Sequence, residues 1–162
     1  YNVTEGLLKG KEIEVLAKVE ENKIDKFFFE DGFFNFKKKN HLAKKTKINI
    51  HKDVFGNKNN DPRIYSSSSL GDQSKTVFNN AIFTSCKFND DCPPWSIKAE
   101  KITHDKIKKD MIYKNAILKV YDVPIFYFPK FFHPDSTVER RSGFLQPRLN
   151  NSKTLGSSIN IP

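Results

Sequence analysis

Alternation of apolar and polar residues dominates this sequence. Residues 13–19 alternate, with Leu16 as the exception, and the pattern returns at 47–50 and 95–99. A period of two is typical of a β-strand with one buried face. No segment keeps the i, i+3, i+4, i+7 apolar spacing of an amphipathic helix over three turns. The sequence therefore predicts an all-β fold in which helix is scarce.

A short repeat recurs on three of the predicted strands, at 29–34, 78–83 and 113–118. Each copy is an aromatic residue, a variable residue, Asp or Asn, Gly or Ala, and two large apolar residues. The small residue permits a bend, and Asp or Asn tolerates a kink in the ladder. Such repeats suit a stacked or rolled antiparallel sheet. Alternation within the copies predicts these inward side chains: Phe34, Phe36, Phe83, Leu118 and Val120.

Other segments are expected to lie outside regular strands. Residues 52–73 contain Gly, Asn, Pro and four consecutive serines, which favours a long surface loop. A second loop is expected at 86–94, where two prolines end it. The aromatic segment 123–134 is interrupted by three prolines. Proline cannot donate to a ladder, so this segment is expected to be an edge strand or a connector.

The net charge is +9, from 28 Lys and Arg against 19 Asp and Glu. Two clusters, 33–39 and 106–109, combine lysines with apolar residues. Exposed aromatics beside lysines could stack on nucleic-acid bases. Only four of the basic residues are Arg, however, and Arg is preferred for bidentate phosphate and base contacts. We therefore expect solvated lysine clusters and no nucleic-acid partner.

The sequence shows no pattern that would support catalysis. There is no Gly-rich phosphate loop, no G-x-S-x-G elbow and no clustered carboxylate pair. We therefore expect no enzymatic activity, no catalytic residue, no metal and no cofactor. The histidines are widely separated and without metal-ligand spacing, so structural or solvated roles are expected for His41, His51, His104 and His133.

Cys86 and Cys92 lie in one predicted loop. Their C-x5-C spacing is not usual for zinc. Two free thiols, a local disulfide, and a bond from either cysteine to a partner beyond the printed sequence all remain open. The sequence begins with Tyr1 and ends within an alternating segment, so we also expect it to be part of a longer protein.

Four stretches together resemble one known family. They are 83–86 followed by 95–97, then 102–105, then 115–120 leading to 123–127, and finally 140–147. On these residues the chain resembles LptD, the lipopolysaccharide-assembly family of the Gram-negative outer membrane, also called the organic solvent tolerance family. The resemblance is weak before residue 74 and close after it.

The resemblance implies a periplasmic β-jellyroll of stacked V-shaped strand pairs over residues 1–125. It implies a Pro-rich aromatic connector over 126–140, and the first strands of an outer-membrane β-barrel over 141–162. The implied function is lipopolysaccharide transport and assembly at the outer membrane, with most of this segment in the periplasm. Implied partners are lipopolysaccharide, a jellyroll protein of the periplasmic bridge, and the lipoprotein plug of the barrel.

The resemblance also implies roles for three positions. Cys86 matches a jellyroll cysteine that is disulfide-bonded to the end of the barrel chain, beyond the printed sequence. Cys92 has no counterpart, so a bond between Cys86 and Cys92 stays open. Pro147 and Pro162 match prolines that weaken strand pairing at a lateral gate for lipid. Two other functions stay open as well: a bridge jellyroll without a barrel, and a basic nucleic-acid-binding module.

Overall fold

The protein is described by a computed structural model. It covers residues 5–21, 23–52, 60–87, 94–135, 138, 148–152 and 156–160. Within these ranges the chain is all-β, as the alternation predicts, and it forms no α-helix. The described part accordingly contains no helix long and apolar enough to cross a membrane.

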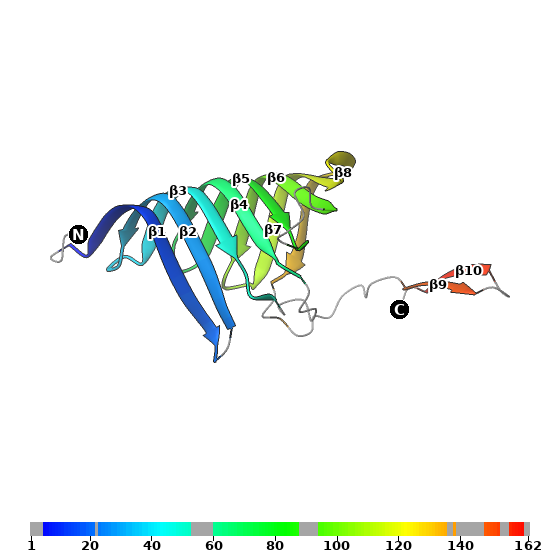
Figure 1. Cartoon of the computed structure of the whole chain (residues 1–162), viewed down its shortest axis with the longest axis horizontal. Helices are drawn as coiled ribbons and strands as arrows, with labels where there is room; N and C mark the ends of the chain where they lie inside the picture. Colours follow the sequence, from blue (N-terminus) through cyan, green and yellow to red (C-terminus); the bar gives the residue numbers. More distant parts are fainter. Residues whose placement is uncertain are drawn as a thin grey trace.

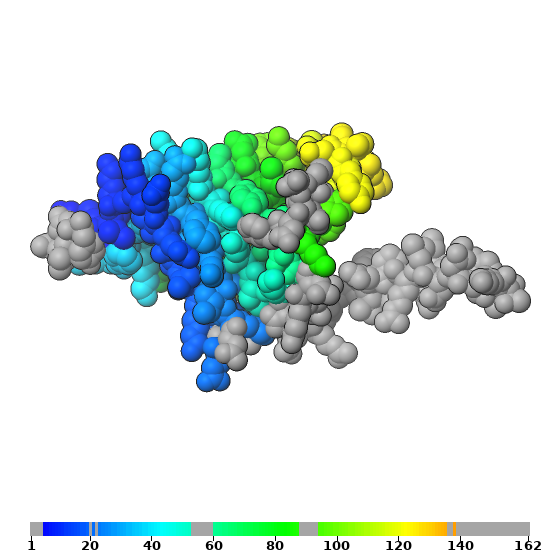
Figure 2. Space-filling view, in the orientation of Figure 1, coloured from blue at the N-terminus to red at the C-terminus, as the bar shows by residue number. Residues whose placement is uncertain are grey.

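Eight strands form one open antiparallel sheet, in which each strand pairs with its neighbours in chain order. Figure 1 shows these strands following one another along the length of the sheet, and Figure 2 shows the same order at the surface, with β1 and β8 at opposite ends. The strands are β1 (Leu7–Glu20), β2 (Lys23–Asn35), β3 (Asn40–Asn49), β4 (Arg63–Gly71), β5 (Lys75–Thr84), β6 (Trp95–Asp105), β7 (Asp110–Val120) and β8 (Val123–Pro134). A separate two-stranded sheet pairs β9 (Arg148–Ser152) with β10 (Gly156–Asn160).

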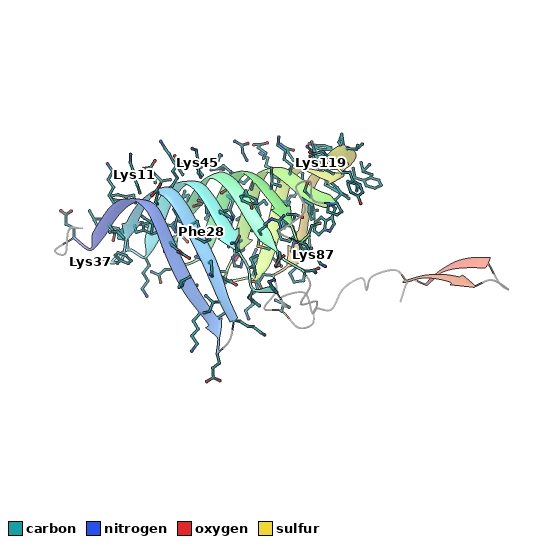
Figure 3. All side chains as sticks on the ribbon, in the orientation of Figure 1. Lys11, Phe28, Lys37, Lys45, Lys87 and Lys119 are labelled. Atoms are coloured by element: carbon teal, nitrogen blue, oxygen red, sulfur yellow. The ribbon has the colours of Figure 1, made fainter. Side chains whose placement is uncertain are left out.

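A single row of residues bends the whole sheet. One residue in each strand is skipped by the pairing of its neighbours, and the skipped residues face one another from strand to strand. In β1, β3, β5 and β7 this residue has a positive φ, between 44° and 50°. We call this set the corner row: Glu12, Glu30, Lys45, Ser67, Asn80, Glu100, Asn115 and Pro129. Figure 3 shows Lys11 and Lys45 projecting outward at the bend.

The corner divides the sheet into two arms and places two inward rows side by side beneath the bend. The first row is Gly10, Gly32, Ala43, Ser69, Phe78, Ile102, Tyr113 and Phe131. The second row is Ile13, Phe29, Thr46, Ser66, Ala81, Ala99, Ala116 and Phe128. Small residues in one row oppose large residues in the other over most of the sheet. This size alternation lets the two rows pack side by side beneath the bend.

Two of the turns that connect neighbouring strands have a similar local structure. The side chain of Asn35 accepts a hydrogen bond from the backbone N–H of Lys38 at 2.8 Å. The side chain of Asp105 accepts bonds from the N–H groups of Ile107 and Lys108 at 3.1 and 2.9 Å. An Asn or Asp that bonds the backbone two or three residues ahead stabilises a tight turn. Consequently the β2–β3 turn and the β6–β7 turn have the same construction.

Two segments expected to lie outside central strands contribute strands to the main sheet. The predicted surface loop at 52–73 is wrong for its second half, because Arg63–Gly71 forms β4 in the middle of the sheet. The four serines favoured a loop in the sequence. In the structure Ser66 and Ser69 are buried, because they are small inward residues beside the corner. The segment 123–134 takes the edge-strand alternative, because β8 pairs only with β7. The sheet thus extends through Pro134, into the range expected to be a connector.

Asn80 offers a direct test of the corner. Its φ is 46°, and a β-branched residue there is strained by about 1–2 kcal/mol. We expect Asn80→Val to lower the free energy of unfolding by that amount, and Asn80→Gly to leave it nearly unchanged, as measured by urea denaturation. Ser67→Val is the matched control, because Ser67 faces Asn80 in the corner row without a positive φ. An equal loss in both valine variants would contradict the strained corner.

Candidate functional site

The two arms enclose a hollow of about 350 Å³, lined from both sides. We name each arm by the inward row that it carries. The apolar arm carries Val15, Phe27, Ile48, Ile64, Phe83, Ile97, Leu118 and Phe126, each paired with the next across the sheet. The histidine arm carries Leu8, Phe34, His41, Gly71, Thr76, His104, Met111 and His133 in the same way.

The apolar row crosses all eight strands without a polar side chain. Directly paired residues of an antiparallel sheet point to the same face, so these side chains form one continuous strip. Its middle belongs to the buried core, where the ring of Phe83 meets that of Trp95 edge-on at 5.8 Å. Toward β1 and β8 the strip becomes more exposed, because no further strand of the described ranges pairs with these two edge strands. The strip is therefore apolar from one edge of the sheet to the other.

The opposite wall carries three imidazole rings, and strand register alone brings them together. His41, His104 and His133 come from β3, β6 and β8. His104 Nε2 lies 2.9 Å from a carboxylate oxygen of Asp135. Gly71 is required beside them, because a Cβ at this position would collide with the ring of His41.

The two hydrogen bonds of His133 fit the neutral tautomer that is protonated on Nδ1. Its Nδ1 lies 2.7 Å from the carbonyl of Pro134, which can only accept, so Nδ1 carries the proton. Its Nε2 then accepts a hydrogen bond from the hydroxyl of Tyr113 at 3.1 Å. Tyr113 is almost fully buried and stacks on Phe131 at 4.4 Å. Burial raises the pKa of Tyr113, so the hydroxyl remains a proton donor at neutral pH.

The surroundings of His41 disfavour its protonated form. Its ring packs on Phe34 at 5.7 Å and on Phe29 at 5.9 Å. Burial lowers the pKa of His41, and the charge of the nearby Lys106 lowers it further. Burial also lowers the pKa of Lys106, whose ammonium donates to the carbonyl of Asp72 at 2.6 Å. Lys106 thus lines the hollow with its ammonium directed to a backbone carbonyl.

A second paired histidine lies on the apolar side of the hollow. Both the backbone N–H and the ring Nδ1 of His51 lie about 3 Å from one carboxylate oxygen of Asp25. This pair joins the segment after β3 to the start of β2. The polar groups that face the hollow are therefore largely paired with one another, which lowers the cost of surrounding it with apolar side chains.

The five side chains predicted to line a groove take different places. Phe83 lines the hollow, Leu118 lies on the inward row of the apolar arm, and Phe34 lies on the inward row of the histidine arm. Val120 is the next inward position of β7 after Leu118 and is more exposed. Phe36 lies outside β2 in the turn that follows, with 56% of its surface exposed, and it does not line the hollow.

The cysteine and proline predictions are only partly covered by the structure. Cys86 is half-buried and forms no disulfide with a described residue, and its sulfur lies 3.6 Å from the carbonyl of Trp95. Cys92, Pro147 and Pro162 lie outside the described residues. The disulfide and the lateral gate therefore stay predictions.

Comparison with models of known protein families and with curated proteins gives no match for this chain. The lipopolysaccharide-assembly resemblance therefore remains a hypothesis. No group of three His, Cys, Asp or Glu side chains suited to a metal ion occurs within the described ranges.

The sequence does not predict that three of the histidines lie on one inward row. His41, His104 and His133 are separated by 63 and 29 residues, and no sequence pattern relates them. Only the register of β3 through β8 places them on one inward row. The adjacent Asp in His104–Asp105 gave no useful signal, because the partner of His104 is Asp135.

The lowered pKa of His41 predicts a pH-dependent stability. The folded protein binds a proton on His41 less readily than the unfolded chain, whose reference pKa is 6.5. Between the folded pKa and 6.5 the unfolded state therefore binds more protons, and stability rises with pH. We expect His41→Phe, which keeps an aromatic ring there, to flatten the rise in unfolding free energy across this range, measured by urea denaturation at a series of pH values. An unchanged slope would contradict this prediction.

Proposed function

We propose that this chain binds lipopolysaccharide in the hollow between its two arms and carries it without chemical change. In this proposal the acyl chains lie along the apolar arm. The single observation that carries the proposal is the uninterrupted apolar strip across all eight strands. Each methylene removed from water contributes about 0.8 kcal/mol, so several acyl chains would be held strongly.

The open edges support transport through the hollow rather than storage in a closed cavity. β1 and β8 each pair on one side only, so neither end of the strip is covered by another described strand. A lipid could therefore slide along the strip from one edge to the other. Such an open edge also accepts a strand from a similar protein, which would extend the strip into a partner. A jellyroll partner of the periplasmic bridge fits this role.

The proposal also assigns the main sheet to a jellyroll and the last residues to the start of a barrel. Stacked V-shaped strand pairs are consistent with eight strands that all bend at one corner row. In this proposal residues 141–162 begin an outer-membrane barrel with its lipoprotein plug, and lipid leaves beside Pro147 and Pro162. The β9–β10 hairpin favours this reading over a bridge jellyroll, which would end with its sheet.

Site-specific photo-crosslinking tests lipid binding. A photo-crosslinking residue placed at Phe83 in the full-length protein should label lipopolysaccharide, because this side chain lines the hollow. The neighbouring Ile82 points to the outer face and is the matched control. The pair Leu118 and Ile117 repeats the comparison near the edge. We expect at least about tenfold more adduct at the inward positions. Equal labelling of both faces, or no adduct at either inward position, would overturn the proposal.

Cysteine variants test the long-range disulfide. If Cys86 pairs with a cysteine at the far end of the full-length protein, oxidation closes a very large loop and shifts mobility in non-reducing electrophoresis. We expect Cys86→Ser to abolish this shift and Cys92→Ser to preserve it. Loss of the shift in Cys92→Ser but not in Cys86→Ser would assign the bond to the other cysteine. No difference between oxidised and reduced wild-type protein would exclude a long-range bond.

A further inference from the structure

An apolar stripe runs along the outer face of the histidine arm. Its members are paired from strand to strand and therefore share that face: Phe33, Leu42, Leu70, Val77, Thr103, Ile112 and Phe132. Leu42, Leu70 and Phe132 expose 55%, 54% and 65% of their surface. A contiguous exposed apolar patch marks an interaction site more often than chance. We call this set the outer stripe.

The outer face of the apolar arm is built differently. There, the corresponding row interleaves apolar side chains with Lys47 and Lys98. The ammonium of Lys47 lies over the rings of Phe28 and Tyr65, at 5.7 and 5.5 Å from their centres. Lysine thus covers the aromatic surface of that arm. The outer stripe has no lysine between Phe33 and Phe132, so its aliphatic side chains face outward directly.

Lysines flank the outer stripe on both sides. Between the stripe and the corner lies a row with five lysines and one acidic residue: Lys11, Asp31, Lys44, Lys101, Lys114 and Lys130, with Ser68 and Asn79 completing it. On the other side are the turns after β2 and β6. These contribute the exposed side chains of Lys37, Lys38, Lys39, Lys108 and Lys109. The nearby Asp105 directs its carboxylate to backbone N–H groups of its own turn.

Each of these two turns also exposes a large apolar residue among its lysines. Phe36 exposes 56% of its surface and Ile107 exposes 78%. Both turns lie on the side of the sheet where these strands end, because β2 and β6 run in the same direction. The two basic and apolar clusters, 33–39 and 106–109, are therefore at the same ends of their strands, with the β4–β5 turn between them.

We propose that the outer face of the histidine arm binds the surface of a lipid bilayer that contains anionic lipids. Aliphatic side chains enter the boundary between headgroups and acyl chains, while flanking lysines attract anionic headgroups. Phe36 and Ile107 insert at the edge. This proposal does not depend on the hollow or on lipopolysaccharide.

Two other occupants fit the surface less well. Nucleic acid binds aromatic stacking platforms, whereas the centre of the stripe is Leu42, Leu70 and Val77, which cannot stack on bases. A second copy of the chain in a two-fold contact would bring like lysine rows together, which is unfavourable. An anionic bilayer offers an apolar boundary to the aliphatic stripe and negative charge to the lysines on both sides of it.

Vesicle co-sedimentation tests the proposal with vesicles of phosphatidylcholine and phosphatidylglycerol that contain no lipopolysaccharide. The chain should bind these and bind pure phosphatidylcholine much more weakly. Replacing Lys37, Lys38 and Lys39 by Ala should weaken binding roughly a hundredfold, since each lysine near an anionic surface contributes about a factor of five. The control replaces Lys18, Lys26 and Lys98 by Ala, which lowers the net charge equally but on the apolar arm, and should change binding little.

A second pair of variants tests the apolar part of the surface. Leu42→Ser with Leu70→Ser should weaken vesicle binding at least tenfold, whereas Tyr65→Ser with Ile82→Ser on the other arm should not. Circular dichroism checks that each variant folds. If a serine double variant does not fold, the comparison of the two lysine variants decides whether the proposal holds. Equal weakening by both lysine sets would overturn the proposal, as would absence of vesicle binding. Binding of a single-stranded oligonucleotide in place of vesicles, or a dimer that only Leu42→Ser with Leu70→Ser dissociates, would also overturn it.

Discussion

The corner row determines how the inward side chains of this sheet pack and how its two arms face each other. At the bend, backbones of neighbouring strands turn together, so the inward side chains on either side approach one another closely. Large side chains cannot occupy both rows. Where Gly10 and Gly32 lie in one row, Ile13 and Phe29 fill the other. A Cβ at Gly32 would collide with the ring of Phe34 and meet the terminal methyl group of Ile13. Toward β7 the sizes exchange, and Ala116 lies beneath Tyr113.

This exchange explains why a sheet with few large core residues can bend and remain packed. In β4, midway along the sheet, both inward positions beside the corner are serine. The hydroxyl of Ser69 lies 2.7 Å from that of Thr46, whereas the buried hydroxyl of Ser66 has no hydrogen-bond partner among the described residues. The bend then makes two arms face each other. Their inward rows line one hollow, which a flat sheet of the same sequence would not have. The candidate binding site is therefore a consequence of the corner and not of any local motif.

The sequence contained enough information for the strands but not for the direction of their bend. Asn80 and Asn115, the third residues of two repeat copies, lie in the corner with positive φ. In the copy at 29–34 the corner residue is Glu30 and not Asp31, because β2 runs opposite to β5 and β7. The structural period joins alternate strands, at Glu12, Lys45, Asn80 and Asn115, with intervals of 33, 35 and 35 residues. Two of these positions are glutamate and lysine, so a repeat pattern that requires Asn or Asp does not detect this spacing.

The two arms also differ in the polarity of their second inward and outward rows, and alternation alone could not reveal this. On the apolar arm the inward row is wholly apolar, and the outward row mixes lysine with apolar residues. On the histidine arm the inward row contains three histidines, Gly71 and Thr76, while the outward row is mostly aliphatic and aromatic. A sheet with water outside both arms would keep its apolar side inward throughout. The proposed bilayer contact would account for this difference, because it places apolar matter against the outer stripe and leaves water against the outer face of the other arm.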